Sequence, residues 1–438
     1  MTVPAPAGPA LTGPAVTVIG CDGGALPPGA AEALAGAALV VGARRHLDAV
    51  CLDGPARGSA RVAELTRLEE ALSEIGNAGG PAVVLASGDP GFFGIVRALR
   101  ARGIRPAVLP AVSSVALAFA RLGLDWDDAI VLSAHGRDPG PVTAAALAHS
   151  KAAILTAPGE PAAELAAALL AGGRRVYAAE RLGTPGEKVA EVTGPGTVLA
   201  DPNVLVALDP EASGARPGGA AGATGAAGTT GAAGTTGAAG PGWVAGHRGA
   251  PPGWALPEEA FEYRDAMITK AEVRALVLAR LGPGLGRTVW DIGAGSGSVA
   301  VECARFGASV YAVEADPAQC ERIRRNAAAH GVGGSVRVVE GAAPAALAGL
   351  PAPDALFAGG GSGEALAAAL ETGRPDRAVA ALASVDRVRA VTELLAAHGY
   401  RAEGVQLQAA RMAPLPGGSL RLAGANPVFV ISGERGPA

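Results

Sequence analysis

The sequence has few residues of the kinds that bind metals or form disulfides. Its four cysteines, Cys21, Cys51, Cys303 and Cys320, are scattered over 438 residues without a C-x-x-C spacing, and its six histidines are equally dispersed. Zinc sites and disulfide frameworks need such residues at short, regular spacings. We therefore expect no metal site, and we expect a protein of the reducing cytoplasm.

The sequence also lacks the marks of membrane and nucleic-acid proteins. No apolar run reaches the ~20 residues that a membrane helix requires, and the N-terminal residues have neither the basic start nor the apolar core of a signal peptide. There is no basic run, and the net charge is −4. An acidic chain without a basic patch is not expected to bind nucleic acid.

One break in composition divides the chain. Residues 214–242 contain a G-A-A-G-T-T repeat and no large apolar residue, so nothing offsets the entropy lost on ordering them. We interpret residues 211–253 as a flexible, disordered linker, with a binding repeat as the alternative. The predicted domains are residues 15–210 and 254–434. Each has its own strands, so we expect the linker to be only a tether between two independent catalysts.

Both halves alternate short apolar runs with helical patterns, which is typical of α/β proteins. In the first half, runs such as residues 15–20 and 81–88 predict the strands of two small sheets, and residues 61–76 predict a helix. In the second half, six or seven runs, including residues 288–293 and 404–411, predict a doubly wound sheet.

A glycine-rich turn in the second half follows an apolar strand and precedes a helix. Its glycines are Gly293, Gly295 and Gly297, whereas a dinucleotide-binding fingerprint would need a glycine in place of Ser298. Without Cβ atoms the loop backbone can approach a bulky, uncharged part of a ligand. The next predicted strand ends at Glu314, whose carboxylate can accept hydrogen bonds from both ribose hydroxyls of an adenosine.

Glycine loop, helix, second strand and acid together resemble the class I S-adenosylmethionine-dependent methyltransferases, and a tight turn without a ligand is the alternative. The resemblance implies a Rossmann-like sheet that binds S-adenosylmethionine. The implied cofactor-binding residues are Thr269, Gly293, Ala294, Gly295, Ser296, Gly297, Glu314 and Ala342. Nucleic-acid and protein methyltransferases would end their fourth strand in D/N-P-P-Y, whereas residues 357–363 read FAGGGSG.

Four motifs occur in a fixed order in the first half. A glycine turn after the first strand is followed by G-A-R-R-H-L (residues 42–47), S-G-D-P-G-F-F-G (residues 87–94) and P-A-V-S-S (residues 110–114). This order resembles the tetrapyrrole methylases, and more narrowly their branch that methylates carbon 5 of precorrin-6Y. The resemblance implies a fold of two subdomains. The implied cofactor-binding residues are Gly88, Asp89, Pro90, Ser113 and Ser114, with the two serines at a helix start and Asp89 alternatively a helix cap.

Together the halves resemble the fused precorrin methyltransferases of cobalamin biosynthesis, in which the second domain methylates carbon 15 and decarboxylates the acetate of ring C. The resemblance implies an enzyme with one S-adenosylmethionine per domain and a corrin substrate, and we also expect a homo-oligomer. A cobalt-containing corrin intermediate of the anaerobic route is the alternative substrate. A cofactor-binding regulator without activity is the alternative function.

The substrate carries several acetates and propionates, and arginine is the best planar partner for such carboxylates. The candidates are Arg44, Arg45, Arg137, Arg264, Lys270 and Arg411, each with a solvated surface charge as its alternative interpretation. Methyl transfer from a sulfonium mainly requires alignment of the reactants and exclusion of water. Decarboxylation needs an electron sink, which a conjugated imine of the ring can supply. We therefore assign no catalytic acid or base from the sequence.

Overall fold

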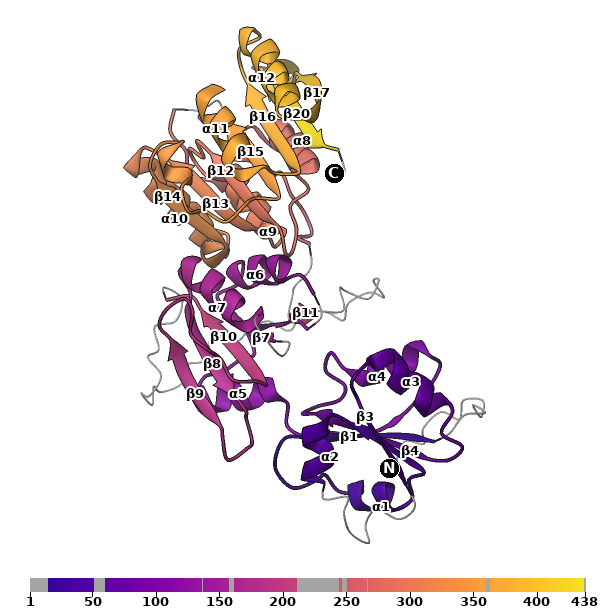
Figure 1. Ribbon diagram of the computed structural model, residues 1–438. Coiled ribbons are helices and arrows are strands. Elements are labelled where there is room, and N and C mark those ends of the chain that lie inside the picture. The colour runs from indigo at the N-terminus through magenta and orange to yellow at the C-terminus, as the bar shows by residue number, and fades with distance from the viewer. Residues whose placement is uncertain are drawn as a thin grey trace.

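The protein consists of three α/β lobes that follow one another along the chain (Figure 1). The computed structural model describes residues 15–50, 60–135, 137–156, 161–210, 244–245, 250–265, 267–359 and 363–436. The first half of the chain forms two lobes and the second half forms one, so the predicted α/β class and the predicted two-subdomain first half are confirmed. Among the described helices, none combines the length and apolar character needed to cross a lipid bilayer.

The first lobe is a five-stranded parallel sheet in the order β3-β2-β4-β1-β5. Its strands are β1 (Val16–Cys21), β2 (Leu39–Gly42), β3 (Arg61–Glu64), β4 (Ala82–Ser87) and β5 (Ala107–Leu109). Helices α1 (Ala30–Ala35) and α2 (Arg44–Ala49) cover one face, and α3 (Leu68–Gly76) and α4 (Ile95–Ala101) cover the other. The prediction of one helix over residues 61–76 is wrong at its start, because Arg61–Glu64 instead pair with the free edge of β2.

The second lobe has a mixed six-stranded sheet in the order β11-β6-β7-β10-β8-β9. Its strands are β6 (Ile130–Ser133), β7 (Lys151–Leu155), β8 (Arg175–Glu180), β9 (Lys188–Val192), β10 (Asn203–Leu208) and β11 (Val244–Ala245). Helix α5 (Ser114–Leu122) packs on one face, and α6 (Pro139–Leu147) and α7 (Pro161–Ala171) pack on the other.

The structure departs from the predicted linker at one point. Val244 and Ala245 pair antiparallel with Leu132 and Val131 of β6, and Val244 packs against the apolar cluster beneath α6 and α7. The unpaired edge of β6 and the apolar cluster beneath α6 and α7 thus hold Val244 and Ala245 in place, although these residues fall within the predicted linker. The repeat itself, residues 214–242, lies outside the described residues.

The third lobe is a doubly wound sheet of seven strands in the order β14-β13-β12-β15-β16-β20-β17, in which β20 is antiparallel to its neighbours. Its strands are β12 (Thr288–Ile292), β13 (Ser309–Glu314), β14 (Val336–Glu340), β15 (Ala355–Gly359), β16 (Arg377–Leu382), β17 (Tyr400–Leu407) and β20 (Val428–Arg435). Helices α8 (Ala271–Leu281), α9 (Ser298–Arg305) and α10 (Pro317–Ala329) cover one face, and α11 (Gly363–Gly373) and α12 (Asp386–Ala397) cover the other.

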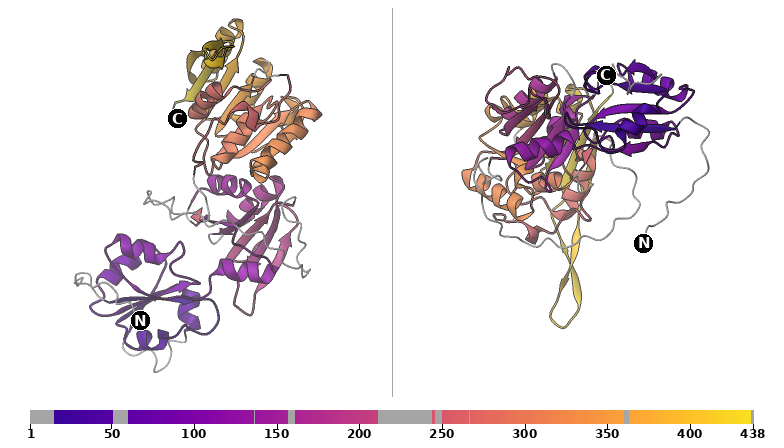
Figure 2. Two further views of the ribbon diagram at one scale, coloured as in Figure 1. Left: turned by 180° about the vertical axis from the view of Figure 1, so that it is seen from behind. Right: turned by 90° about the horizontal axis from the view of Figure 1, so that it is seen from below.

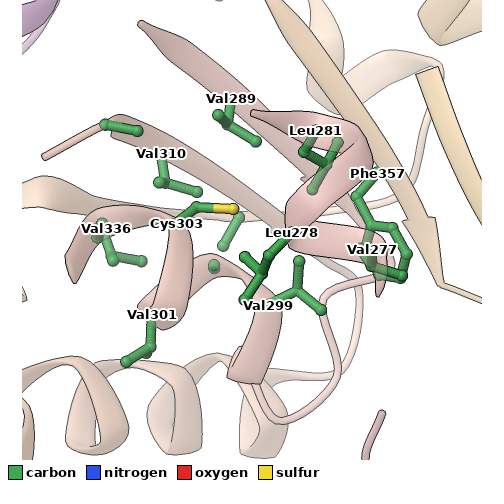
Figure 3. Close-up of a cluster of buried hydrophobic side chains, with 14 of the residues drawn as sticks. Val277, Leu278, Leu281, Val289, Val299, Val301, Cys303, Val310, Val336 and Phe357 are labelled. Atoms are coloured by element: carbon green, nitrogen blue, oxygen red, sulfur yellow. The ribbon is translucent and has the colours of Figure 1, made fainter. Parts of the chain in front are cut away.

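The core on the α8–α9 face fixes where α9 begins. Figure 3 shows Val289, Val310 and Phe357 of three neighbouring strands among the side chains of α8 and α9, which include Val277 and Val299. All five side chains are at most 2% exposed. Residues that alternate with them along the strands face the opposite core. This packing holds the start of α9 against the end of β12, where the glycine loop lies.

A two-stranded hairpin leaves the body of the third lobe. The strand predicted over residues 404–411 is wrong in its second half, because β17 ends at Leu407 and a separate strand, β18 (Ala410–Pro414), begins. β18 pairs only with β19 (Leu420–Gly424) within the described sheets. Figure 2 shows the hairpin extending away from the rest of the molecule.

Candidate functional site

Three glycines connect β12 to α9 at the carboxyl edge of the third sheet. Gly293, Gly295 and Gly297 have φ angles of 68°, 56° and 73°, a left-handed region that residues with a Cβ rarely adopt. A Cβ at Gly297 would lie 2.8 Å from Cγ2 of Ile323, whereas a Cβ at Gly295 would meet no described atom within 4 Å. Gly297 therefore lets the loop close on α10, and Gly295 faces open space that suits a ligand.

Glu314 ends β13 beside this loop and holds it. Its Oε2 accepts a hydrogen bond from the Gly295 amide at 2.8 Å, and its Oε1 accepts one from the Asp316 amide at 2.9 Å. The residue is half-buried. Each carboxylate oxygen can accept a further hydrogen bond, so the carboxylate can hold the loop and a ribose hydroxyl together. The neighbouring Ala294 and Ser296 lie in the same loop, between the glycines.

A buried acid, Asp291, lies behind the loop in β12. It is 1% exposed, its Oδ2 accepts a hydrogen bond from the Ala300 amide at 3.0 Å, and its Oδ1 has no partner among the described atoms. Burial raises the pKa of Asp291 to about 7, and the hydrogen bond from Ala300 only partly offsets that rise. Sequence reasoning missed this residue, although a carboxylate within the apolar strand V-W-D-I was the available signal.

Asn326 of α10 joins the glycine loop to the segment that precedes α8. Its Nδ2 donates to the carbonyl oxygens of Ser296 at 2.8 Å and of Glu262 at 2.9 Å, and its Oδ1 accepts from the Glu262 amide at 2.8 Å. This residue is buried and was also missed, because an asparagine in a polar helix carries no distinctive spacing. It fixes the loop through the carbonyl of Ser296.

The remaining residues predicted for the second half lie around this edge. Thr269 and Lys270 immediately precede α8, and the Thr269 carbonyl accepts a hydrogen bond from the buried Arg274. Ala342 is exposed just after β14, whose last residue, Glu340, lies beside Glu314 in the sheet register. Within the described residues, neither Thr269 nor Ala342 forms a hydrogen bond with the glycine loop, so their cofactor roles stay predictions.

Arg411 is engaged elsewhere. Its guanidinium donates two hydrogen bonds to Glu258, at 2.9 and 2.8 Å, and two to Glu272, both at 2.8 Å. Glu258 is only 3% exposed, and the hydrogen bonds from Arg411 lower its pKa to about 2. Arg411 thus anchors the hairpin to the body of the lobe, which argues against the predicted contact with substrate carboxylates.

In the first lobe, three chain segments meet at the carboxyl edge of the sheet. Gly88 follows β4 with a φ of 57°, and its amide donates to the carbonyl of Cys21 at 2.8 Å. A Cβ at Gly20 would collide with the Gly88 oxygen, and a Cβ at Gly88 would lie 3.1 Å from the Cα of Ser113. Backbone therefore approaches backbone here, and the predicted residues Gly88 and Ser113 are neighbours.

The two serines and Asp89 behave differently from one another. Ser113 caps α5, with its Oγ accepting a hydrogen bond from the Ala116 amide at 3.1 Å, and Ser114 is the first helical residue, as predicted. Asp89 does not cap α4, which begins at Ile95 after Gly94. Its Oδ1 instead accepts a hydrogen bond from the Gly91 amide at 2.8 Å, which stabilises the turn formed by residues 89–91. The helix-cap interpretation of Asp89 is therefore wrong.

Helix α2 adds a polar cluster beside Gly88. Arg45 Nη2 donates to the Oγ of Ser87 at 2.7 Å, and His46 Nε2 lies 2.9 Å from the same oxygen. Burial, with the neighbouring Arg45 charge, lowers the pKa of His46 to about 4, so its imidazole is neutral at pH 7. The sequence suggested Arg45 but gave no role to Ser87 or His46. Their position in the R-R-H and S-G-D-P motifs was the available signal.

The other candidate cations lie on the surface. Arg44 pairs with Asp48 across 3.0 Å on the exposed side of α2, and Arg264 pairs with Asp316 across 3.2 Å. Arg137 is exposed in the loop after β6, and Lys270 is half-buried. Among the described residues of the first lobe, Arg45 is the candidate cation that reaches the glycine turn, through its hydrogen bond to Ser87.

Comparison with known proteins gives each half its own family. Residues 19–195 match the tetrapyrrole (corrin/porphyrin) methylases, and residues 259–433 match the precorrin methyltransferase domain. A precorrin-6Y C(5,15)-methyltransferase (decarboxylating) from Sinorhizobium sp is 36% identical over 429 residues, which cover 93% of this chain and 94% of that protein.

Smaller relatives cover about half of the chain. A probable cobalt-precorrin-6B C(15)-methyltransferase (decarboxylating) from Pyrobaculum calidifontis is 37% identical over 190 residues, which are 42% of this chain and 96% of that protein. A crystal structure of a precorrin-6Y C5,15-methyltransferase from Geobacter metallireducens shares 30% identity and has a TM-score of 0.39, covering 41% of this chain and 97% of that one. The near full-length match to the relative from Sinorhizobium shows that the chain belongs to the family of precorrin-6Y C(5,15)-methyltransferases (decarboxylating).

Proposed function

We propose that this protein methylates precorrin-6Y at carbons 5 and 15 and removes the ring C acetate carboxyl as carbon dioxide, in cobalamin biosynthesis. The observation that carries the proposal is the presence of two glycine cradles in one chain that matches a fused relative of that name over 93% of its length. The same proposal includes a cytoplasmic location and no nucleic-acid partner, in keeping with the acidic net charge of −4.

The proposal assigns one S-adenosylmethionine to each half. The open space at Gly295, beside the half-buried carboxylate of Glu314, fits the cofactor in the second half. In the first half, the turn at Gly88 and the capped start of α5 at Ser113 form the corresponding cradle. We propose that the first half methylates carbon 5 and the second methylates carbon 15 and decarboxylates. A relative named only for the carbon 15 and decarboxylating steps has the length of one half.

Each bound cofactor supplies an activated methyl group. The residues of this chain bind and orient the reactants, because an in-line displacement depends on alignment more than on acid–base catalysis. Glu314 fixes the position of the Gly295 amide, and Asn326 fixes the Ser296 carbonyl, so the loop is held in shape before a ligand arrives. In the first half, Arg45 is positioned by Ser87 and is the best-placed cation for a substrate carboxylate.

We also propose that the protein forms a homo-oligomer through the β18–β19 hairpin. Met412, Leu420 and Leu422 are 74%, 61% and 70% exposed, and Met412 lies opposite Leu422 in the hairpin register. A second copy of the same hairpin would bury these side chains in a self-complementary contact. Light scattering should report a multimer for the native chain and a monomer for the M412S/L422S double variant. A monomeric native chain would refute this part of the proposal.

One experiment tests the activity as a whole. The full chain is incubated with metal-free precorrin-6Y and S-adenosylmethionine, and the product is examined by mass spectrometry. The expected product carries two additional methyl groups and lacks one carbon dioxide. Cofactor binding without turnover would instead indicate a regulator. Turnover of only the cobalt-containing substrate would indicate the alternative suggested by the relative from Pyrobaculum.

A further inference from the structure

The second and third lobes touch through a small polar surface. On the second lobe it consists of Leu147, Ala148, Ser150, Gly173, Arg174 and Asp209, and on the third lobe of Leu285, Gly334, Ser335 and Arg337. We call this the docking surface. Figure 1 shows α6 and α7 of the second lobe lying next to the third lobe. We propose that the docking surface is a stable interface that holds the two halves of the chain together without the help of the linker.

Arg174 is the centre of the docking surface. Its Nη1 pairs with Oδ2 of Asp209 across 2.7 Å, and its Nη2 donates to the carbonyl oxygens of Leu147 and Gly334, each at 2.6 Å. The Arg174 side chain is 7% exposed and that of Asp209 is 12% exposed. Burying a guanidinium costs free energy unless its donors have acceptors. The third lobe supplies one acceptor, the carbonyl of Gly334, whereas Nε of Arg174 has no partner among the described atoms.

Further contacts surround Arg174. Ser335 is buried, and its hydroxyl donates a hydrogen bond to the carbonyl of Ala148. Leu285 packs against the apolar cluster beneath α6 and α7, whose buried members all belong to the second lobe. The interface therefore combines two hydrogen bonds, from Arg174 to Gly334 and from Ser335 to Ala148, with the apolar contact of Leu285.

Glycines face the other lobe at two points of the docking surface and leave room for its side chains. A Cβ at Gly334 would lie 3.1 Å from Oδ2 of Asp209 and 3.6 Å from the amide nitrogen of Ser150. On the facing side, a Cβ at Gly173 would collide with the guanidinium of Arg337. By contrast, a Cβ at the adjacent Gly333 would meet only its own lobe, 3.9 Å from the Cα of Ala328. The close fit is thus specific to the residues that face the other lobe.

The docking surface lies away from the glycine loop of the third lobe. Gly334 and Ser335 belong to the turn η3 (Gly333–Ser335), immediately before the amino end of β14. The glycine loop follows the carboxyl end of β12, and a five-residue strand such as β12 or β14 is roughly 17 Å long. Docking therefore uses the opposite edge of the sheet and leaves the cofactor cradle uncovered. The proposal does not depend on which reaction each half performs.

The first test separates covalent linkage from docking. A protease site is inserted into the repeat near Thr229, the folded full-length protein is cleaved, and the two pieces are followed by size-exclusion chromatography. We expect the pieces of the native sequence to co-elute. Gly334→Leu should place a side chain against Asp209 and Ser150 and weaken the association by about tenfold or more. Gly333→Leu is the matched control and should co-elute like the native sequence.

The second test detects the contact in the uncut chain. The Ser150→Cys/Gly334→Cys double variant places two thiols where a Cβ at position 334 would lie 3.7 Å from the Cα of residue 150, which is compatible with a disulfide. Mild oxidation followed by cleavage in the repeat should leave the pieces covalently joined, and neither single variant should do so. Separate elution of the native pieces together with no disulfide in the double variant would overturn the proposal. Circular dichroism verifies that each variant is folded.

Discussion

The carboxylate of Glu314 accepts a hydrogen bond from the Gly295 amide, and we propose that it also accepts one from the ribose of S-adenosylmethionine. In Glu314→Ala both the Gly295 amide and the ribose hydroxyls lose a charged acceptor, a loss of about 1.5–3 kcal/mol. We expect the affinity of the second half for S-adenosylmethionine to fall roughly ten- to a hundredfold. Titration calorimetry on the full chain measures this, with the site in the first half as internal control. Glu314→Gln retains an acceptor for the Gly295 amide and should lose less affinity for the cofactor. An unchanged affinity in Glu314→Ala would exclude Glu314 as the residue that binds the ribose.

Two of the three glycines of the same loop, Gly295 and Gly297, should respond differently to substitution. A side chain at Gly295 enters open space but must adopt a left-handed φ of 56°, so Gly295→Val should lower the melting temperature through backbone strain alone. The same side chain should block the cofactor and abolish methylation at carbon 15 while sparing carbon 5. A side chain at Gly297 collides with Ile323, so Gly297→Val should lower the melting temperature further. Mass spectrometry of the product and thermal melts distinguish the two effects. A second methyl group in the Gly295→Val product would show that the loop is not the site.

Asp291 should make stability depend on pH. Its folded pKa of about 7 lies above the ordinary 3.8, so between these values the folded state holds a proton that the unfolded state has lost. The contribution of Asp291 to the free energy of unfolding therefore falls as pH rises from about 4 to about 7. Asp291→Asn keeps an acceptor for the Ala300 amide but cannot titrate. The free energy of unfolding, measured with urea between about pH 4 and pH 8, should fall less steeply with pH in this variant than in the native protein. The same pH dependence in both proteins would mean that Asp291 ionises normally.

Individual site residues could be predicted where a motif fixes the backbone. The glycines, Ser113 and Glu314 lie where the strand–loop–helix spacing put them, because turn geometry is local. Ser87, Asn326 and Asp291 were missed, since their roles arise from partners that are distant in sequence or from burial. The pairing of Arg411 with Glu258 could not be predicted for the same reason, because nothing in the sequence links residues that lie 153 positions apart.

At the scale of elements, the β18–β19 hairpin depends on the Arg411 cluster. Arg411→Ala leaves the buried Glu258 without its main partner and should destabilise the hairpin by about 1–3 kcal/mol. Hydrogen exchange should accelerate in residues 410–424 and not in β12.

The same variant should change how stability depends on pH. Because the pKa of Glu258 is depressed, its contribution to the free energy of unfolding is present above its ordinary value of 4.5 and is lost as pH falls toward about 2. This loss of stability in acid should disappear in Arg411→Ala. A raised KM for the corrin with unchanged exchange would restore Arg411 as a substrate ligand.

Element type was predictable in the buried strands and less so at the edges. The central strands β4 and β12 are apolar runs with helices on both faces of their sheets, so composition alone identifies them. The edge strands β3 and β11 form because a neighbouring strand offers unpaired backbone groups, which is a tertiary cause. The hairpin was merged with β17 because Gln408 and Ala409 give no turn signal of the glycine or proline kind.

At the scale of the whole molecule, the proposed docking surface leaves the glycine loop of the third lobe uncovered. We therefore expect the intermediate to pass through solvent between the two sites. We expect Gly295→Val, impaired in the second half, and Gly88→Val, impaired in the first, to complement each other when mixed as full-length proteins. The rate of full product formation should rise with total enzyme concentration, because the singly methylated corrin must leave one chain and bind another. Mass spectrometry at several dilutions measures this. Failure to complement at high concentration would indicate direct transfer between sites.

The separation of the docking surface from the glycine loop also bears on how such a chain can evolve. Substitutions that tune affinity for a corrin fall at the carboxyl edge of the third sheet, whereas those that tune association fall near η3 and β14. Selection can therefore alter substrate preference without weakening the contact between the halves. It can equally weaken that contact without damaging either active site. A fused gene of this design fixes the ratio of the two activities at one to one through translation, while each active site stays free to diverge at its own pace.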